Sequence, residues 1–258
     1  MMHVHDGDAR PVALVTGAGK GIGRAAAVAL AREGFGVALL ARDDVSGQEA
    51  VAACEAAGSE ALWLAADVAS EEQVEAAFAR LDERWGRLDV LVNNAGIYAK
   101  GDVLSTTLDD WERVQRVNVT GAFLCAKFAV PLMQRAGGGS IINVASEAGL
   151  VGIPGQLAYN VSKAALIAMT RSMAVDLAPE EIRVNCVCPG TTLTPLVEAS
   201  VARDAEPEKL LAHLGNIRPA GRLGTAEEIA GAIAYFAADH ARYTTGAVLS
   251  VDGGYTAQ

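Results

Sequence analysis

Short runs of aliphatic and β-branched residues alternate along the chain with longer segments in which apolar residues recur at helical spacing. The short runs predict seven strands, over 11–17, 35–41, 60–68, 88–96, 139–146, 182–190 and 246–254. The longer segments predict helices over 22–33, 48–58, 70–86, 107–135, 156–177 and 225–239. Strands that alternate with helices across short loops predict an α/β fold built on a doubly wound parallel sheet.

The organisation of the chain is predicted to be simple. Half of the residues are hydrophobic and only 5% are aromatic, so Ala, Val, Leu and Ile must form the core. Because no Gly/Ser-rich linker divides the pattern, we predict one domain over 11–258, with a loop-rich substrate segment at about 191–220. Residues 1–10 are predicted to be a flexible tail, and they lack the apolar segment of a secretory signal.

Charge and cysteine content narrow the classes of partner. The formal net charge of −10 argues against binding to nucleic acid or to an anionic membrane, so we expect a small-molecule partner and a cytoplasmic location. The four cysteines show no metal-binding spacing, and no metal site is predicted. Cys186 and Cys188 would point to one face of a strand, and we expect buried, reduced thiols.

Ligands of doubly wound sheets bind beyond the carboxyl ends of the strands, so the residues that follow each strand are the candidates. The stretch TGAGKGIG follows the first predicted strand and contains Gly17, Gly21 and Gly23. Glycines allow the backbone to approach a pyrophosphate, which the amino end of the next helix attracts. The same glycines would also suit a tight strand-to-helix connection with no ligand.

A second candidate lies in the helix-forming stretch AYNVSKAAL, where Tyr159 and Lys163 stand four residues apart. Side chains at this spacing project from one face of a helix. A surface helix with a half-exposed Tyr and a solvated Lys would show the same pattern. Ser146, at the end of the fifth predicted strand, precedes Tyr159 by thirteen residues.

Five motifs follow one another in fixed order: Thr16-Gly17-x-x-x-Gly21-x-Gly23, Asn93-Asn94-Ala95-Gly96, Ser146, Tyr159-x-x-x-Lys163 and Pro189-Gly190. Taken together, they resemble those of the short-chain dehydrogenase/reductase family, from residue 11 to the end of the chain. The resemblance extends to the group that includes 3-oxoacyl-carrier-protein reductases and polyol dehydrogenases. It implies a Rossmann-type fold and hydride transfer between a nicotinamide cofactor and a carbonyl/alcohol pair.

The resemblance also implies catalytic roles. Tyr159 would be the acid/base, Lys163 its electrostatic partner, and Ser146 a hydrogen-bond donor to the substrate oxygen. Because a phenol with a pKa of about 10 is a poor base near pH 7, we expect the charge of Lys163 to lower that pKa. Asn118 matches the family's helix Asn, whose backbone helps to hold a relay water, although a helix-surface amide would have the same spacing.

The cofactor is expected to be NADP(H), with NAD(H) as the alternative. The family's acidic ribose-binding position falls on Ala41, while Arg42 and Lys20 are cations suited to a 2′-phosphate. A shift of one or two residues would instead bring Asp43 or Asp44 to the ribose. The cofactor-binding residues that the resemblance implies are Gly17, Lys20, Gly21, Ile22, Gly23, Arg42, Asp67, Val68, Asn94, Ala95, Gly96, Tyr159, Lys163, Pro189, Gly190, Thr192 and Thr194.

The substrate is less well defined. The candidates for its binding are Ser146, Glu147, Gln156 and Tyr159. Glu147 and Gln156 indicate hydroxyls or a polar tail on the substrate, unless both side chains face solvent. We favour a small alcohol or ketone over an acyl-carrier substrate, because acidic neighbours offset the basic residues Arg203, Lys209 and Arg218 that an acidic carrier would need.

Two further expectations concern class and assembly. A different class, an NADP-binding redox sensor without catalysis, stays open because a fold does not determine a function. Such a protein would be expected to have lost the Tyr, Lys or Ser of the motif set, and all three are present. The resemblance implies a homotetramer.

Overall fold

The computed structural model describes residues 10–258, and residues 1–9 of the tail predicted over 1–10 lie outside them. Within these described residues, seven strands form one sheet in which every pairing is parallel, in the order β3-β2-β1-β4-β5-β6-β7. The strands are β1 Val12–Thr16, β2 Gly36–Ala41, β3 Ala61–Ala65, β4 Val90–Asn93, β5 Gly139–Val144, β6 Ile182–Pro189 and β7 Val248–Val251. The predicted doubly wound parallel sheet is confirmed, and its order reverses between β1 and β4.

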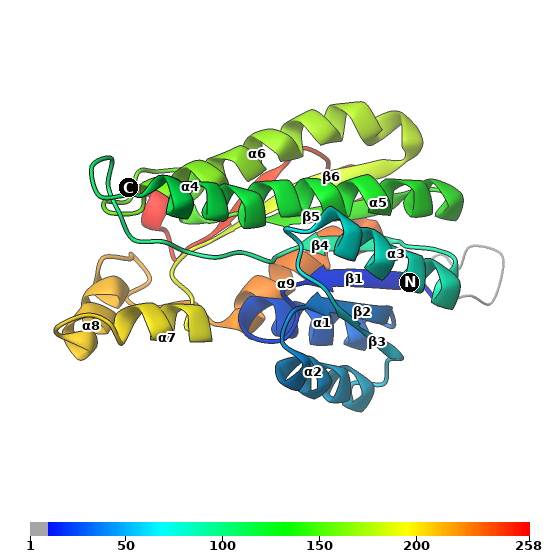
Figure 1. Cartoon of the computed structure of the whole chain (residues 1–258), viewed down its shortest axis with the longest axis horizontal. Coiled ribbons are helices and arrows are strands. Elements are labelled where there is room, and N and C mark those ends of the chain that lie inside the picture. Colours follow the sequence, from blue (N-terminus) through cyan, green and yellow to red (C-terminus); the bar gives the residue numbers. More distant parts are fainter. Residues whose placement is uncertain (1–9) are drawn as a thin grey trace.

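Helices cover both faces of this sheet (Figure 1). The helices are α1 Gly21–Arg32, α2 Asp44–Ala56, α3 Glu71–Trp85, α4 Leu108–Gln115, α5 Gly121–Ala136, α6 Leu157–Leu177, α7 Pro195–Val201, α8 Pro207–Asn216 and α9 Ala226–Ala237. The part of the chain that the structure describes also contains the π-helix η1 Arg116–Thr120, between α4 and α5, and the short 3-10 helices η2 Glu147–Gly149, η3 Ala178–Glu180, η4 Asp239–Ala241 and η5 Tyr255–Ala257.

Alternate residues of each central strand enter different cores. Val12 and Leu14 of β1 face α3 and α5, whereas Ala13 and Val15 face α1 and α9. Because both faces are covered, the strands are apolar throughout rather than alternating, as in other buried parallel sheets. The sheet is therefore a rigid platform on which the loops at its carboxyl edge are held.

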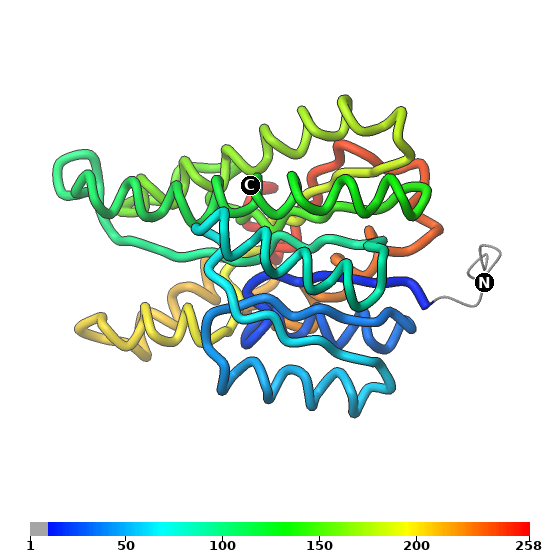
Figure 2. Tube along the Cα trace, turned by 45° about the vertical axis from the view of Figure 1, so that its right-hand side comes forward, coloured from blue at the N-terminus to red at the C-terminus, as the bar shows by residue number. Residues whose placement is uncertain are grey.

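The predicted loop-rich stretch at 191–220 is largely helical instead. Helices α7 and α8 each begin with a proline at the first helical position, where proline is tolerated because the N–H there has no partner within the helix. Both helices project beyond the carboxyl ends of the strands (Figures 1 and 2). Their residues are mostly exposed, so the sequence lacks the apolar periodicity of a packed helix.

The helical run Leu108–Ala136 is long and apolar enough to cross a membrane by length and composition alone. About half of its apolar window, 50%, is buried inside the protein, where α5 packs against α3, β4 and β5. A core helix has the same composition, so the hydropathy of this segment follows from the fold.

Candidate active site

The glycine-rich turn between β1 and α1 has the geometry of an anion site. Gly17 and Gly21 adopt φ of 64° and 58°, values that favour glycine. A Cβ atom on Gly23 would lie 2.3 Å from the carbonyl oxygen of Gly17, so the turn is tightly closed. Within residues 10–258, α1 has no side-chain cap and no acidic residue in its first turn, which leaves its N–H groups available to a pyrophosphate.

The motif after β4 is joined to this turn by hydrogen bonds. The hydroxyl of Thr16 accepts from the backbone N–H groups of Asn94 at 3.0 Å and Ala95 at 2.9 Å. The side-chain amide of Asn94 donates to the carbonyl of Thr16 at 2.8 Å. These hydrogen bonds join the two motifs at the point where the strand order reverses, which is where doubly wound sheets bind their ligands.

The charged side chains at the end of β2 differ in the hydrogen bonds and ion pairs that they make with the rest of the protein. The side chain of Asp43 caps α2 by accepting from the N–H of Val45, which explains why α2 begins four residues earlier than predicted. Asp44 accepts a hydrogen bond of 2.7 Å from the indole of Trp63. Arg42 is exposed and lies 3.6 Å from Asp67 in a loose ion pair, which costs little to exchange for another anion.

Other predicted cofactor residues also lie at the carboxyl edge of the sheet. They lie in the first turn of α1, in the loops after β3 and β4, and at and after the end of β6: Ile22, Val68, Gly96, Pro189, Gly190, Thr192 and Thr194. Thr194 is placed over the glycine-rich turn, since a Cβ atom on Gly21 would lie 3.4 Å from its side chain. Asp67 uses one carboxylate oxygen to accept from the N–H of Ala69, as a turn residue does.

Ser146, Tyr159 and Lys163 are brought together by β5 and α6. Ser146 lies close enough to Tyr159 for its hydroxyl to hydrogen-bond the phenol and lower the pKa of Tyr159. The Nζ atom of Lys163 lies 5.5 Å from the centroid of the Tyr159 ring and donates to the carbonyl of Val144 at 2.8 Å. One hydroxyl, one phenol and one ammonium thus converge, as the groups of an acid/base site do.

The pKa of Tyr159 is raised, whereas the sequence predicted that it would be lowered. Burial raises the pKa of Tyr159 to about 12, and the Ser146 hydrogen bond offsets only part of this effect. Burial also lowers the pKa of Lys163 to about 8. The expected net lowering of the Tyr159 pKa was wrong for the protein's own groups, because desolvation outweighs the effects of the neighbouring groups and Lys163 donates to the Val144 carbonyl.

Asn118 is a buried residue of the π-helix η1, not a helix-surface amide. Its side chain accepts from the N–H of Ile97 at 2.8 Å and donates to the Ile97 carbonyl at 3.0 Å. It also donates to Ser162 at 2.9 Å, and Ser162 donates to the carbonyl of Tyr159 at 2.8 Å. The π-helix and these bonds connect the loop after β4 to the helix that carries the phenol.

Glu147 and Gln156 were predicted to contact the substrate, and both pair with other residues of the protein. Glu147 is only 4% exposed, and its carboxylate is paired with Arg218, so it does not line an open polar wall. Gln156 precedes α6, half-buried, and pairs with Gly101 in an isolated β-bridge. The ring of Tyr98 meets that of Tyr159 edge-on, with centroids 5.7 Å apart.

Two residues of this site were missed from the sequence. Ser162 lies three residues after the predicted Tyr159, and this one-turn spacing on the helix was an available signal. Arg218 was considered only as a surface cation, yet it is 3% exposed. No pattern in its polar, proline-containing neighbourhood indicates burial.

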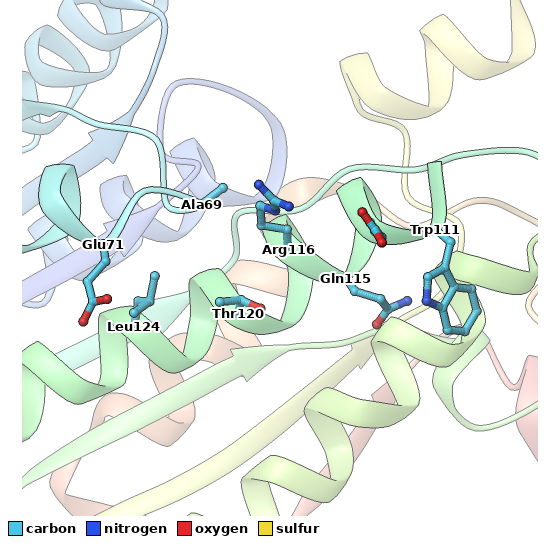
Figure 3. A pocket seen from close by; sticks show the side chains of 8 residues that line it. Ala69, Glu71, Trp111, Gln115, Arg116, Thr120 and Leu124 are labelled. Atoms are coloured by element: carbon cyan, nitrogen blue, oxygen red, sulfur yellow. The ribbon is translucent and has the colours of Figure 1, made fainter. Parts of the chain in front are cut away.

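A separate surface depression of about 480 Å³ lies along α4, η1 and the start of α5 (Figure 3). Its lining includes Trp111, Gln115 and Arg116 together with Glu71 from α3. Neither Tyr159 nor Lys163 contributes to it. The depression is therefore distinct from the cluster of Ser146, Tyr159 and Lys163.

This geometry identifies the chain as a member of the short-chain dehydrogenase/reductase family, and comparison with known proteins agrees. The sequence family described as "Enoyl-(Acyl carrier protein) reductase" matches residues 17–256. The protein is an NAD(P)-dependent oxidoreductase that acts on alcohols and carbonyl compounds, and the prediction of this reaction class is confirmed.

Three similar proteins illustrate the relationship. An uncharacterized oxidoreductase of Thermotoga maritima is 47% identical, with 95% of this chain and 97% of the relative covered. A 3beta-hydroxysteroid dehydrogenase of Mediterraneibacter gnavus is 40% identical, with 95% and 94% covered. The crystal structure of levodione reductase superposes with a TM-score of 0.93 at 35% identity, over 96% of this chain and 98% of that one.

Proposed function

We propose that this enzyme uses NADPH to reduce a largely apolar ketone to a secondary alcohol. The observation that carries the proposal is the convergence of Ser146, Tyr159 and Lys163 around a phenol that the protein keeps protonated. The phenol is protonated at neutral pH, as an unshifted tyrosine also is, so it can donate a proton to a ketone oxygen.

In the proposed mechanism, the bound cofactor supplies the hydride to the carbonyl carbon. Tyr159 gives its Oη proton to the carbonyl oxygen, and Ser146 donates a hydrogen bond to the same oxygen as its negative charge develops. Lys163 places a positive charge beside the phenol ring and stabilises the phenolate that remains. Asn118 and Ser162 fix the helix turn from which the phenol projects.

The segments that flank this group favour an apolar substrate. Tyr98 packs on Tyr159, while Leu150, Val151 and Leu193 are exposed on the turns after Ser146 and after β6. With Glu147 paired to a buried cation, the main reason to expect a polyol disappears. The names of levodione reductase and of 3beta-hydroxysteroid dehydrogenase are in keeping with an apolar ketone or alcohol.

The structure offers little to an acidic acyl carrier. Of the three basic residues considered for docking, Arg218 is buried and Lys209 is paired with Glu206. The non-catalytic sensor receives no support, because the three catalytic groups are present and brought together. Ketone reduction is therefore the favoured function.

The preference for NADPH rests on the charges at the end of β2. Asp43 and Asp44 are engaged in a helix cap and an indole hydrogen bond, whereas Lys20 and Arg42 are exposed cations. A 2′-phosphate gains charge-assisted hydrogen bonds from such cations, and a ribose hydroxyl does not. We therefore assign Lys20 and Arg42 to the cofactor's phosphate.

Fluorescence titration of the purified protein tests this assignment. Changing both Lys20 and Arg42 to Ala should raise the Kd of NADPH about 100-fold, the effect of losing two hydrogen bonds to charged groups. The Kd of NADH should change by less than about threefold, because it lacks the phosphate. The matched control is Arg24→Ala, which removes an exposed arginine paired with Glu49; equal losses for both cofactors would reject the assignment.

We also propose that the enzyme is a cytoplasmic homotetramer. Phe123 of α5, Val175 of α6 and Leu249 of β7 are large apolar residues exposed on this chain, and burial in subunit contacts would remove them from water. Light scattering during size-exclusion chromatography measures the mass directly. A monomer would contradict this part of the proposal.

A further inference from the structure

A buried ion pair connects two segments that flank the catalytic group. The Nη2 atom of Arg218 lies 2.5 Å from Oε1 of Glu147, and the two side chains are 2% and 5% exposed. The same Nη2 atom donates to the hydroxyl of Thr191, also at 2.5 Å. A guanidinium that has lost its hydration depends strongly on such partners, so the three groups are held together.

Arg218 lies two residues after a segment with little packing of its own. Residues 195–216, which comprise α7 and α8 and are here termed the flap, bury only Val201 and Gly215 within the described chain. The flap projects beyond the carboxyl edge of the sheet (Figure 1). Because so little apolar surface is buried, contacts at its two ends must set its position.

The two ends of the flap are held differently. At its start, Thr192 pairs with Gly224 in an isolated bridge, and Leu193 donates to the carbonyl of Gly224. At its end, Nη1 of Arg218 donates back to the carbonyl of Leu214 in α8, while the guanidinium lies 5.1 Å from the centroid of the Tyr255 ring. The side chain of Arg218 is thus the buried junction between the flap and the body of the protein.

On the other side of the pair, the turn after Ser146 has its own support. The Ser146 hydroxyl accepts from the N–H of Ala148 at 3.1 Å, and the N–H of Gly149 donates to the Ser146 carbonyl at 3.0 Å. The carboxylate of Glu147 therefore extends from a turn that would keep its shape without Arg218. Loss of the pair should release the flap and leave the catalytic serine in place.

Packing around the pair cannot replace these polar contacts. A cavity of about 150 Å³ lies beside Arg218 and Thr191, between the ends of β6 and β7 and the start of α9. Within residues 10–258, Nε of Arg218 and Oε2 of Glu147 have no hydrogen-bond partner. The Nη atoms and Oε1 therefore make the hydrogen bonds that anchor the segment.

We propose that Arg218 is a positioning residue of this enzyme, which anchors the flap through Glu147 to the turn that carries Ser146. The anchor sets how closely the flap covers a bound substrate. The inference rests on the proposed catalytic role of Ser146 and Tyr159, but the anchoring itself is independent of turnover. Breaking the anchor should weaken substrate binding more than it slows the chemical step.

The test compares Arg218→Lys with the matched control Arg222→Lys. Arg222 lies four residues after Arg218, is exposed and is paired with Glu228. Hydrogen–deuterium exchange, read by mass spectrometry on peptides from 195–216, measures the flap directly. In Arg218→Lys, exchange there should be at least about tenfold faster, the effect of losing one hydrogen bond to a charged group. Exchange in the sheet and in α6 should be unchanged, and Arg222→Lys should match the wild type.

Kinetics with the best ketone of a panel provide the second readout. In Arg218→Lys, KM should rise about tenfold while kcat stays within about threefold, as expected when ground-state and transition-state binding are lost equally. Glu147→Gln, which keeps the volume of the side chain and removes its charge, should change exchange and KM in the same direction.

Unchanged exchange over 195–216 in both variants would overturn the proposal, and so would a fall in kcat with KM unaltered. If Arg218→Lys does not fold, the exchange over 195–216 and the kinetic constants of Glu147→Gln alone test the proposal. Failure of the wild type to reduce any ketone would contradict the proposed function. The exchange measurement would still decide whether Arg218 anchors the flap.

Discussion

The buried ammonium of Lys163 should cost the folded protein stability, and replacing it should reveal how much. The pKa of Lys163 falls from 10.5 to about 8 because its side chain is 3% exposed. Since one pH unit corresponds to about 1.4 kcal/mol, holding the charged form costs about 3 kcal/mol at pH 7. That shift already includes the hydrogen bond from the ammonium to Val144. Removing the lysine leaves the Val144 carbonyl without this donor, which costs about 1 kcal/mol, so the expected net gain is about 2 kcal/mol.

Lys163→Met should therefore raise the free energy of unfolding at pH 7 by about 2 kcal/mol while abolishing turnover. A lysine whose folded pKa lies below its unfolded value costs stability below the folded pKa, and the cost disappears as the pH rises toward the unfolded value. The gain should thus be full below pH 8 and mostly lost by pH 10.5.

Urea unfolding at pH 7 and at pH 9.5, followed by circular dichroism, measures both parts of this prediction. Lys127→Met is the matched control, because Lys127 is exposed and paired with Glu71, and its loss should change stability by less than about 1 kcal/mol. A Lys163→Met protein less stable than the wild type at pH 7 would refute the reasoning. A gain that is the same at both pH values would show that desolvation of the charge is not its cause.

Two further predictions test the cofactor turn and the core. Gly23→Ala should weaken NADPH binding and lower the free energy of unfolding by about 1–3 kcal/mol, because the added methyl group overpacks against Gly17. Gly231→Ala, in open space on α9, should instead raise the free energy of unfolding by about 0.5–1 kcal/mol. Equal effects of the two changes on urea unfolding would contradict this prediction. Burial raises the pKa of Cys54 to about 11 and of Cys125 to about 12, so dithiobisnitrobenzoate should label the cysteines only after unfolding, and rapid labelling of the native protein would disprove their burial.

The arrangement of strands and helices was largely predictable, because burial on both faces leaves continuous apolar runs in the strands. Thr225 and Ser70 cap the helices that follow them, as their sequence positions indicated. The helices of the flap were not predictable, since exposed helices need no apolar periodicity. The early start of α2 depends on the capping bond of Asp43, a residue that had been considered for the ribose.

For the site, the residue types were predictable and their electrostatics were not. The spacing of Tyr159 and Lys163 placed both on one helix face, and the strand-end rule placed Ser146 near them. Burial of the Lys163 charge and of Arg218 arises from segments far apart in the chain, which no local pattern reports. The direction of the pKa shifts of Tyr159 and Lys163 follows from that burial.

The central claim, that Tyr159 transfers the proton, is tested most directly by Tyr159→Phe. Single-turnover oxidation of NADPH with a ketone in excess, followed by absorbance, should slow at least about 100-fold, the typical contribution of a general acid. The Kd of NADPH should stay within about twofold, since the ring is retained. Tyr98→Phe, whose ring packs edge-on against Tyr159, is the control and should remain active. A Tyr159→Phe enzyme that turns over at the wild-type rate would contradict the account.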